Sequence, residues 1–292
     1  MKKISFILIL AALFFAGCDK IEGPYIDIPH HEDVTVVFPE LDKSTVYRKV
    51  LIEEFTGHKC TNCPGGHEKL AELHNIFKDT LVMVGIHATS LAKPSSNANS
   101  IWKYDFRTEE GMDIADYFGI SGIPAAIINR QPYAGGWGIS EWQSKIQAVD
   151  RSKSYAAIQM INQFNTPSQN SLKVNVKVTM LENYDAPVKL SLLLIEDGII
   201  KPQMLGDLST DTNYVHNHVL RANLNGTFGE YLTPDGKVEK DSAYIYAYTI
   251  DFTKHDWVPA NCSVVAILYD QSPNGQALQV ECIPVLSNKR NK

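Results

Sequence analysis

The segment FTGHKCTNCPGGH, residues 55–67, places Cys60 and Cys63 two residues apart. A cysteine pair at this spacing is typical of a redox dithiol, of half a metal site, or of a structural disulfide. An apolar segment rich in β-forming residues, VYRKVLIEEF over 46–55, leads into the motif. Beyond it, GHEKLAELHNIFKD over 66–79 places its apolar residues at helical spacing. The cysteines are therefore expected between a strand and a helix.

The alternation of strands and helices continues to residue 152. The sequence predicts a buried strand over 80–88, a helix over 108–118, a turn and strand over 119–129, and a last helix over 139–152. The polar segment LAKPSSNANSIWKYDFR, 91–107, has no clear period and predicts an inserted loop. Strands separated by single helices predict an α/β domain over residues 46–152.

From about residue 153 the spacing of apolar residues changes from helical to alternating. LKVNVKVTM, 172–180, places every second residue on one apolar face, and four later segments behave similarly: VKLSLLLIE, AYIYAYTIDF, SVVAILYD and ALQVECIPV. Several short strands without a convincing helix predict an all-β, immunoglobulin-like sandwich over residues 153–292. The two domains are expected to join near 152–155.

The N-terminus predicts export and lipid anchoring. MKKISFILILAALFFAGC has two lysines, then an apolar run too short to span a bilayer, then small residues before Cys18. This ending resembles a bacterial lipobox, which implies a signal peptide over 1–17, lipidation of Cys18 and a tether over 18–45. The alternative is an ordinary secretory signal with a chance cysteine. Export agrees with disulfide formation, because oxidising compartments preserve disulfides.

Composition excludes some partners. Hydrophobic residues make up 44% and charged residues 21% of the 292 residues, which is an ordinary globular mixture. The formal net charge is −6 and no basic stripe is visible, so no nucleic-acid partner is expected.

The order of Glu54, the Cys-x-x-Cys motif and Ile123-Pro124 resembles the thioredoxin superfamily over residues 46–152. This resemblance implies that Cys60 is the nucleophile and Cys63 the resolving thiol, with Glu54 as a buried proton relay. It also implies that Pro124 is a cis-proline and that the backbone of Ile123 binds an extended substrate. No dissolved cofactor is implied, since a partner dithiol would supply the electrons.

Two features depart from the thioredoxin pattern. Lys59 stands where tryptophan is common, and Pro64-Gly65-Gly66 follows the second cysteine. Each glycine costs a helix interior about 1 kcal/mol, and proline lacks the N–H for a helical hydrogen bond. We therefore expect the helix to begin nearer Gly66, with both cysteines in a loop. These departures favour the alternative of a structural disulfide in a non-catalytic binding protein.

Other candidate sites are weaker. His58 and His67 are too few to predict a metal centre, and His67 is expected to face solvent. His216 and His218 have the spacing of one strand face, but no third ligand is visible, so no metal is expected. Trp102 and Tyr104 in the insert are candidate partner-binding residues. The alternating Tyr244, Tyr246 and Tyr248 suggest either a sandwich face or a ligand-binding stripe.

Cys262 and Cys282 raise the question of a second disulfide. A two-residue turn at Asn274-Gly275 predicts that Cys282 faces Ile267, far from Cys262. At about 3.4 Å per residue, the two sulfurs are then beyond disulfide reach. The sequence therefore favours two unpaired, partly buried thiols.

Three long segments, EEFTGHKCTNCPGGH, YDFRTEEGMDIADYFGISGIPA and YVHNHVLR, resemble the 28-kDa outer-membrane-protein-related lipoproteins. The resemblance covers both halves of the chain. It implies an outer-membrane lipoprotein, facing the periplasm or the cell surface. Its partners would be either thiols and disulfides of envelope proteins or a surface ligand bound in adhesion.

Overall fold

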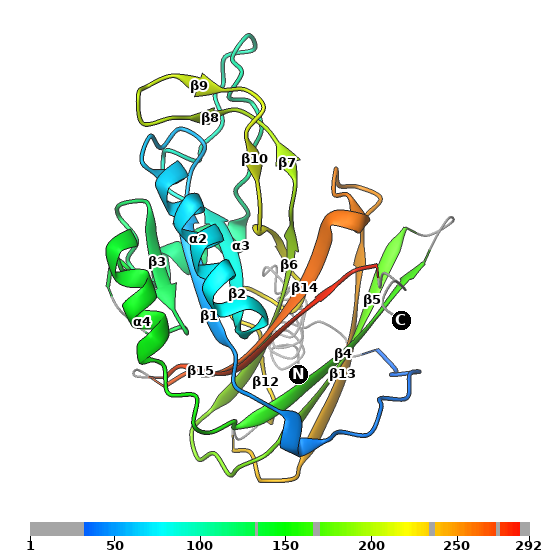
Figure 1. Ribbon diagram of the computed structural model, residues 1–292. Coiled ribbons are helices and arrows are strands. Elements are labelled where there is room, and N and C mark those ends of the chain that lie inside the picture. Colours follow the sequence, from blue (N-terminus) through cyan, green and yellow to red (C-terminus); the bar gives the residue numbers. More distant parts are fainter. Residues whose placement is uncertain (1–31, 132–133, 166–169, 234–236, 273–274, 287–292) are drawn as a thin grey trace, which may run out of the picture.

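The computed structural model describes residues 32–131, 134–165, 170–233, 237–272 and 275–286. Its largest feature is an eight-stranded sheet in the order β15-β14-β6-β11-β2-β1-β3, with β12 also paired to β6 (Figure 1). The strands are β1 (Val50–Thr56), β2 (Leu81–His87), β3 (Ala125–Ile128), β6 (Val188–Glu196), β11 (Val219–Asn223), β12 (Glu230–Tyr231), β14 (Cys262–Asp270) and β15 (Ala277–Pro284). The predicted signal peptide and Cys18 lie outside the described residues.

Helices cover both faces of the β1–β2–β3 end of this sheet. Helices α2 (Cys63–Phe77) and α4 (Trp142–Ala148) pack on one face, where Leu73, Trp142 and Ile52 share a buried cluster. Helix α3 (Glu109–Tyr117) packs on the other face through Ile114. Strand β1 is parallel to β2 and antiparallel to β3. Short 3₁₀ turns are η2 (Lys43–Thr45), η3 (Lys78–Thr80), η4 (Ile139–Glu141) and η5 (Pro259–Asn261).

A second, three-stranded antiparallel sheet packs against the other end of the large sheet. It contains β4 (Ala156–Asn165), β5 (Ser171–Met180) and β13 (Ala243–Asp251) in the order β13-β5-β4. The alternation predicted over 172–180 is confirmed, because every second side chain of β5 is buried against β6 and β14. In β13, the Tyr246 and Tyr248 hydroxyls donate hydrogen bonds to the Leu232 carbonyl and to the Glu230 carboxylate.

The strands of the two chain halves belong to one sheet. Val219 of β11 pairs in parallel with Gly85 of β2, whose N–H donates to the His218 carbonyl at 2.7 Å. Leu193 and Val265 then pack in the same cluster as Ile114 of α3. Strands β6 and β14 are thus buried on both faces, which explains their nearly continuous apolar sequences. The structure is a mixed α/β fold and does not show a separate immunoglobulin-like sandwich.

An arm over residues 199–216 leaves the large sheet between β6 and β11. It consists of four two-residue strands: β7 (Ile199–Ile200), β8 (Gln203–Met204), β9 (Thr210–Asp211) and β10 (Val215–His216). β7 pairs with β10 and β8 with β9. Figure 1 shows the arm extending past the sheet to the N-terminal end of α2.

Cys262 and Cys282 are unpaired, as expected. The register differs from the expectation, because Cys282 faces Val265 and not Ile267. Burial raises the pKa of the Cys262 thiol to about 12 and that of the Cys282 thiol to about 11. Among the described residues, no helix combines the length and apolarity needed to cross a bilayer.

Candidate functional site

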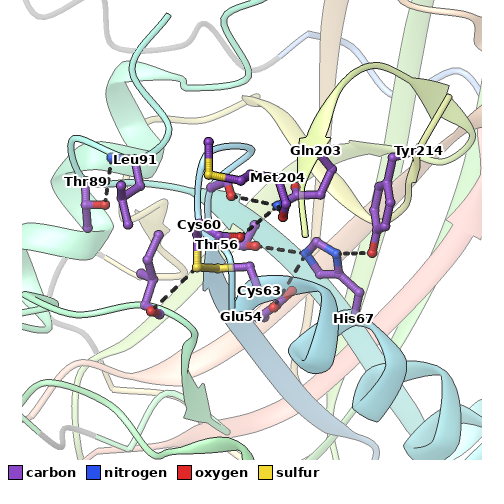
Figure 2. Close-up of a disulfide and its surroundings, with 12 residues drawn as sticks. Glu54, Thr56, Cys60, Cys63, His67, Thr89, Leu91, Gln203, Met204 and Tyr214 are labelled. Carbon is purple, nitrogen blue, oxygen red and sulfur yellow. Dashed lines mark hydrogen bonds and ion pairs between the residues drawn. A yellow bond between two sulfur atoms is a disulfide. The ribbon is translucent and has the colours of Figure 1, made fainter. Parts of the chain in front are cut away.

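Cys60 and Cys63 form a disulfide at the start of helix α2, with their Cα atoms 5.4 Å apart (Figure 2). The expectation that the helix begins near Gly66 was wrong, because α2 begins at Cys63. Pro64 lies in the first turn, where backbone N–H groups have no partner inside the helix, so its missing N–H costs little there. The cysteine pair therefore lies where the helix dipole favours a thiolate.

The close packing of α2 next to the cysteine pair explains why residue 66 is glycine. A Cβ atom at Gly66 would lie 2.6 Å from Oε1 of Glu54 and 3.3 Å from Cβ of Pro124. The first distance is shorter than any normal Cβ contact, so Oε1 would have to move, and the second is a tight contact. Gly66 thus lets α2 lie close to the buried acid and to the proline loop. This explains one of the two glycines that depart from the thioredoxin pattern, Gly66 but not Gly65.

Glu54 lies near the end of β1 and is 1% exposed. Burial raises the pKa of its carboxyl group to about 8, because the ionised form loses its hydration. Its Oε1 atom has no hydrogen-bond partner and lies 3.7 Å from Nε2 of His67. A carboxyl group that changes protonation near neutral pH is suited to accept a thiol proton, as the predicted relay requires.

The peptide bond between Ile123 and Pro124 is cis, as expected. The Ile123 carbonyl oxygen lies 3.7 Å from Sγ of Cys60. Ile123 and Pro124 are half-buried and Gly122 is exposed, so this loop borders the disulfide on a side that reaches solvent. The sequence-predicted set of Glu54, Cys60, Cys63, Ile123 and Pro124 therefore lies together around one disulfide.

The arm covers the disulfide on another side. The fully buried Gln203 side chain donates from Nε2 to the Cys60 carbonyl at 2.9 Å, and the Met204 N–H donates to the His58 carbonyl at 2.9 Å (Figure 2). Cys60 is 3% exposed and Cys63 is fully buried. Cys60 is the more exposed of the two, as expected, but both are shielded from solvent. Sequence analysis missed Gln203 because two-residue strands carry no periodic signal.

The 91–107 insert also lies against the motif. The Lys59 N–H donates to the Leu91 carbonyl at 3.0 Å, and the Trp102 ring stacks on His58 with ring centres 5.4 Å apart. Trp102 therefore lies against His58, two residues before Cys60. Tyr104 instead contacts Phe106, at 4.7 Å between ring centres, and has the Lys201 ammonium 4.5 Å from its ring centre.

A buried cluster of histidines surrounds Phe106 beside the site. The Phe106 ring centre lies 4.3 Å from that of His87, 4.5 Å from that of His216 and 5.6 Å from that of His58. Burial lowers the pKa of His58 to about 4 and that of His216 to about 3, so both rings are neutral near pH 7. His87 was missed, although its position at the end of a buried strand was a usable signal.

The predicted face shared by His216 and His218 is not present. His216 points into the buried cluster, whereas His218 has a positive φ and its Nδ1 lies 3.1 Å from Asp197. Within the described part of the chain, no three His, Cys, Asp or Glu side chains are placed to hold a metal ion.

His67 does not face solvent freely, so that expectation was wrong. One ring nitrogen, Nε2, is 2.8 Å from the Thr56 hydroxyl, and the other, Nδ1, is 2.7 Å from the Tyr214 hydroxyl. His67 lies one helical turn beyond Cys63, on the same face of α2. That spacing was the signal for its place in the site, whereas nothing local indicated Tyr214.

The family model described as outer membrane protein Omp28 matches residues 112–289. The match covers more than half of the chain. This chain belongs to the Omp28 family. That assignment places it in the outer membrane, as the sequence predicted. The Omp28 match includes Pro124 but begins after Cys60 and Cys63, so it does not cover the dithiol.

Two solved structures share the fold of this Omp28 protein with a TM-score above 0.5. HBP35 of Porphyromonas gingivalis matches with a TM-score of 0.62 and 16% identity, over 82% of this chain and 76% of that one. A protein of Agrobacterium tumefaciens matches with a TM-score of 0.51 and 12% identity, over 85% and 99% of the two chains. An Omp28 domain from P. gingivalis is 25% identical over 45% of this chain, with a TM-score of 0.30. No curated protein sequence matches significantly.

Proposed function

We propose that this outer-membrane protein exchanges thiols and disulfides with other proteins of the cell envelope. The observation that carries the proposal is the arrangement of Cys60 and Cys63 at the start of α2, between the buried carboxyl of Glu54 and the Ile123-Pro124 loop. This arrangement supplies a nucleophile, a resolving thiol, a proton acceptor and a substrate-facing backbone.

The reaction begins with the reduced pair, which a partner dithiol of the envelope produces. The Cys60 thiolate attacks a substrate disulfide, forms a mixed disulfide and releases one substrate thiolate. Cys63 then loses its proton to Glu54 and attacks the Cys60 sulfur. This step closes the Cys60–Cys63 disulfide and releases the second substrate thiolate, so the substrate gains the two electrons that the dithiol loses.

The remaining parts of the chain serve this chemistry at a membrane. We propose that lipidated Cys18 anchors the protein and that residues 46–152 form a thioredoxin-like domain. The packing of β4, β5 and β13 on β6 and β14 supports an immunoglobulin-like sandwich as the basis of residues 153–292. The exposed loop at Gly122, with Ile123 and the stacked Trp102, is the proposed substrate-binding surface.

A second candidate function is non-catalytic binding of a surface ligand. The observation in its favour is the arm, because Gln203 and Met204 cover the disulfide and leave Cys60 only 3% exposed. A disulfide shielded in this way can act as a staple for residues 57–63. Binding would then depend on the surface of the 91–107 insert and on the β-rich half, without any change of the cysteines.

A trapping experiment separates the two functions. In a Cys63→Ser variant, the mixed disulfide on Cys60 cannot be resolved. Thiol exchange therefore predicts covalent adducts between this variant and envelope proteins, and dithiothreitol should cleave these adducts. Cys60→Ser/Cys63→Ser is the matched control and should give none. The binding function is correct if the pre-reduced Cys63→Ser variant forms no adduct and the double variant binds its ligand normally.

A further inference from the structure

His67 connects the buried acid of the site to the arm. Its Nε2 faces Oε1 of Glu54 at 3.7 Å, and its Nδ1 bonds to the Tyr214 hydroxyl at 2.7 Å. Figure 2 shows the imidazole lying between the two groups. The Glu54 side chain is 2% exposed and that of His67 is 21% exposed, while Tyr214 is half-buried. The three side chains therefore form a line from the interior toward the surface.

The two nitrogens of an imidazole allow this line to carry a proton. A neutral imidazole has one N–H and one accepting nitrogen. When Nε2 accepts a proton from Glu54, Nδ1 can release its own proton to Tyr214, and the ring remains neutral afterwards. Nε2 lies 2.8 Å from the Thr56 hydroxyl, whereas Oε1 of Glu54, at 3.7 Å, is beyond hydrogen-bond distance. The transfer therefore requires Glu54 to move closer to Nε2 and to displace the Thr56 hydroxyl.

We propose that His67 and Tyr214 are the route by which the Glu54 proton reaches solvent during resolution of the mixed disulfide. The inference rests on the proposed thiol exchange and deepens it. His67 and Tyr214 are positioning residues, because they act through Glu54 and do not touch the sulfur atoms. Tyr214 belongs to the arm, so the route is complete only when the arm is docked on the site.

The proton that leaves Cys63 can be followed to solvent step by step. With a pKa of about 8, Glu54 is ionised in a minority of molecules at pH 7, and these react. In them the Cys63 thiol gives its proton to the Glu54 carboxylate, and the Cys63 thiolate attacks the Cys60 sulfur of the mixed disulfide. The protonated Glu54 passes a proton to Nε2 of His67 while Nδ1 gives one to the Tyr214 oxygen, which loses its own to water. Glu54 is then ionised again, and the departing substrate thiolate takes its proton from solvent.

The groups around His67 keep it from holding the proton. The ring centre of His216 in β10 lies 6.3 Å from that of His67. Burial, and to a smaller extent the charge of His218, lower the pKa of His67 to about 4. On the solvent side, Glu68 of α2 and Asp211 of β9 face Tyr214, as does Glu54 from β1. An imidazole in this setting transfers a proton and does not store it.

The test uses the reduced full-length protein in detergent micelles, with oxidised glutathione as the probe. Rapid acid quenching and mass spectrometry of the Cys60–Cys63 peptide separate the dithiol, the glutathione mixed disulfide and the closed disulfide. They give one rate constant for attack by Cys60 and one for resolution by Cys63. The variants are His67→Gln and Tyr214→Phe. Tyr117→Phe, an exposed tyrosine of α3, is the matched control.

The proton route predicts that both site variants slow resolution at least about tenfold at pH 7 and leave the attack step unchanged. The remaining resolution rate should rise with pH more steeply than in wild type, because hydroxide must then remove the proton. Tyr117→Phe should match wild type in both steps. Imidazole added to a His67→Gly variant should restore resolution, which a packing defect would not permit.

Three results would overturn the proposal. If attack proceeds normally and resolution is equally fast in all four proteins, the route through His67 is wrong while thiol exchange remains. If wild type forms no mixed disulfide with glutathione, the proposed exchange fails and the route fails with it. A loss of both rate constants in the variants, without rescue by imidazole, would assign His67 a purely structural role.

Discussion

At the scale of single residues, the site is organised around Glu54, a buried carboxyl group whose Oε1 atom has no hydrogen-bond partner. Its burial raises the pKa, and glycine at residue 66 leaves room for Oε1 in its present position. The buried acid, the two cysteines and the cis Ile123-Pro124 bond were predicted from the resemblance of these motifs to the thioredoxin superfamily. The sequence did not predict that Gly66 belongs to the site, because the reason is a contact with a residue twelve positions away.

Replacement of Gly66 tests this contact. Gly66→Ala places a Cβ atom 2.6 Å from Oε1 of Glu54, so we expect the free energy of unfolding to fall by about 1–3 kcal/mol. The control is Gly65→Ala, whose Cβ would lie 3.9 Å from its nearest neighbour. There the gain in helix propensity should stabilise the protein by up to about 1 kcal/mol. Urea denaturation of the oxidised proteins measures both, and equal effects of the two substitutions would refute the contact.

The raised pKa of Glu54 predicts a pH dependence of stability. Between pH 4.5, the ordinary value, and about 8, the folded protein holds a proton that the unfolded chain has lost. The free energy of unfolding therefore falls as pH rises through this range, by at most about 1.4 kcal/mol per pH unit. Glu54→Gln removes this pH-dependent contribution. The free energy of unfolding of the variant, relative to that of wild type, should therefore increase from pH 5 to pH 8. A difference that is constant with pH in urea denaturation would contradict the buried, protonated state.

At the scale of elements, the βαβ unit follows from local patterns, whereas the start of α2 at Cys63 and the arm do not. Helix α2 has apolar residues at helical spacing, and β1 and β2 are continuous apolar runs. Each strand of the arm is two residues long, and its position depends on side chains such as Gln203 that bond to the motif over 140 residues away. Such contacts leave no periodic signal in the sequence.

Docking of the arm predicts how fast the disulfide can be reduced. Gln203→Ala removes the buried hydrogen bond to the Cys60 carbonyl, which costs about 1–3 kcal/mol. If the arm must open before a reductant enters, reduction of Cys60–Cys63 by a phosphine should become roughly tenfold faster or more. Gln159→Ala on β4, where the side chain bonds to the Pro39 carbonyl, is the control and should change nothing. An unchanged rate in Gln203→Ala would show that the arm does not limit access.

At the scale of the whole molecule, the two halves of the chain share one sheet, and Arg130 of the first half packs against Tyr269 of the second. Arg130, which follows β3, bonds to Glu53 of β1 at 3.1 Å, and its guanidinium lies 4.6 Å from the centre of the Tyr269 ring in β14. The sequence predicted both halves by their periods. It could not predict their joining, because the parallel contact between β11 and β2 involves a single residue pair, Val219 and Gly85.

A shared sheet predicts cooperative unfolding. Strands β6 and β14 lose the cover of α3 if the first half unfolds, so neither half should persist alone. Urea denaturation followed by circular dichroism and by tryptophan fluorescence should therefore give one transition with the same midpoint. Two separate midpoints would instead indicate two independently stable units, joined near residues 152–155.

The central claim is that the Cys60–Cys63 pair exchanges electrons with envelope proteins, and its reduction potential tests that claim most directly. Equilibration of the full-length protein in glutathione or dithiothreitol buffers, followed by alkylation and mass spectrometry of the Cys60–Cys63 peptide, gives the value. Thiol exchange predicts a potential in the oxidoreductase range, roughly −120 to −270 mV. A potential below about −300 mV would contradict it and identify the disulfide as a structural staple.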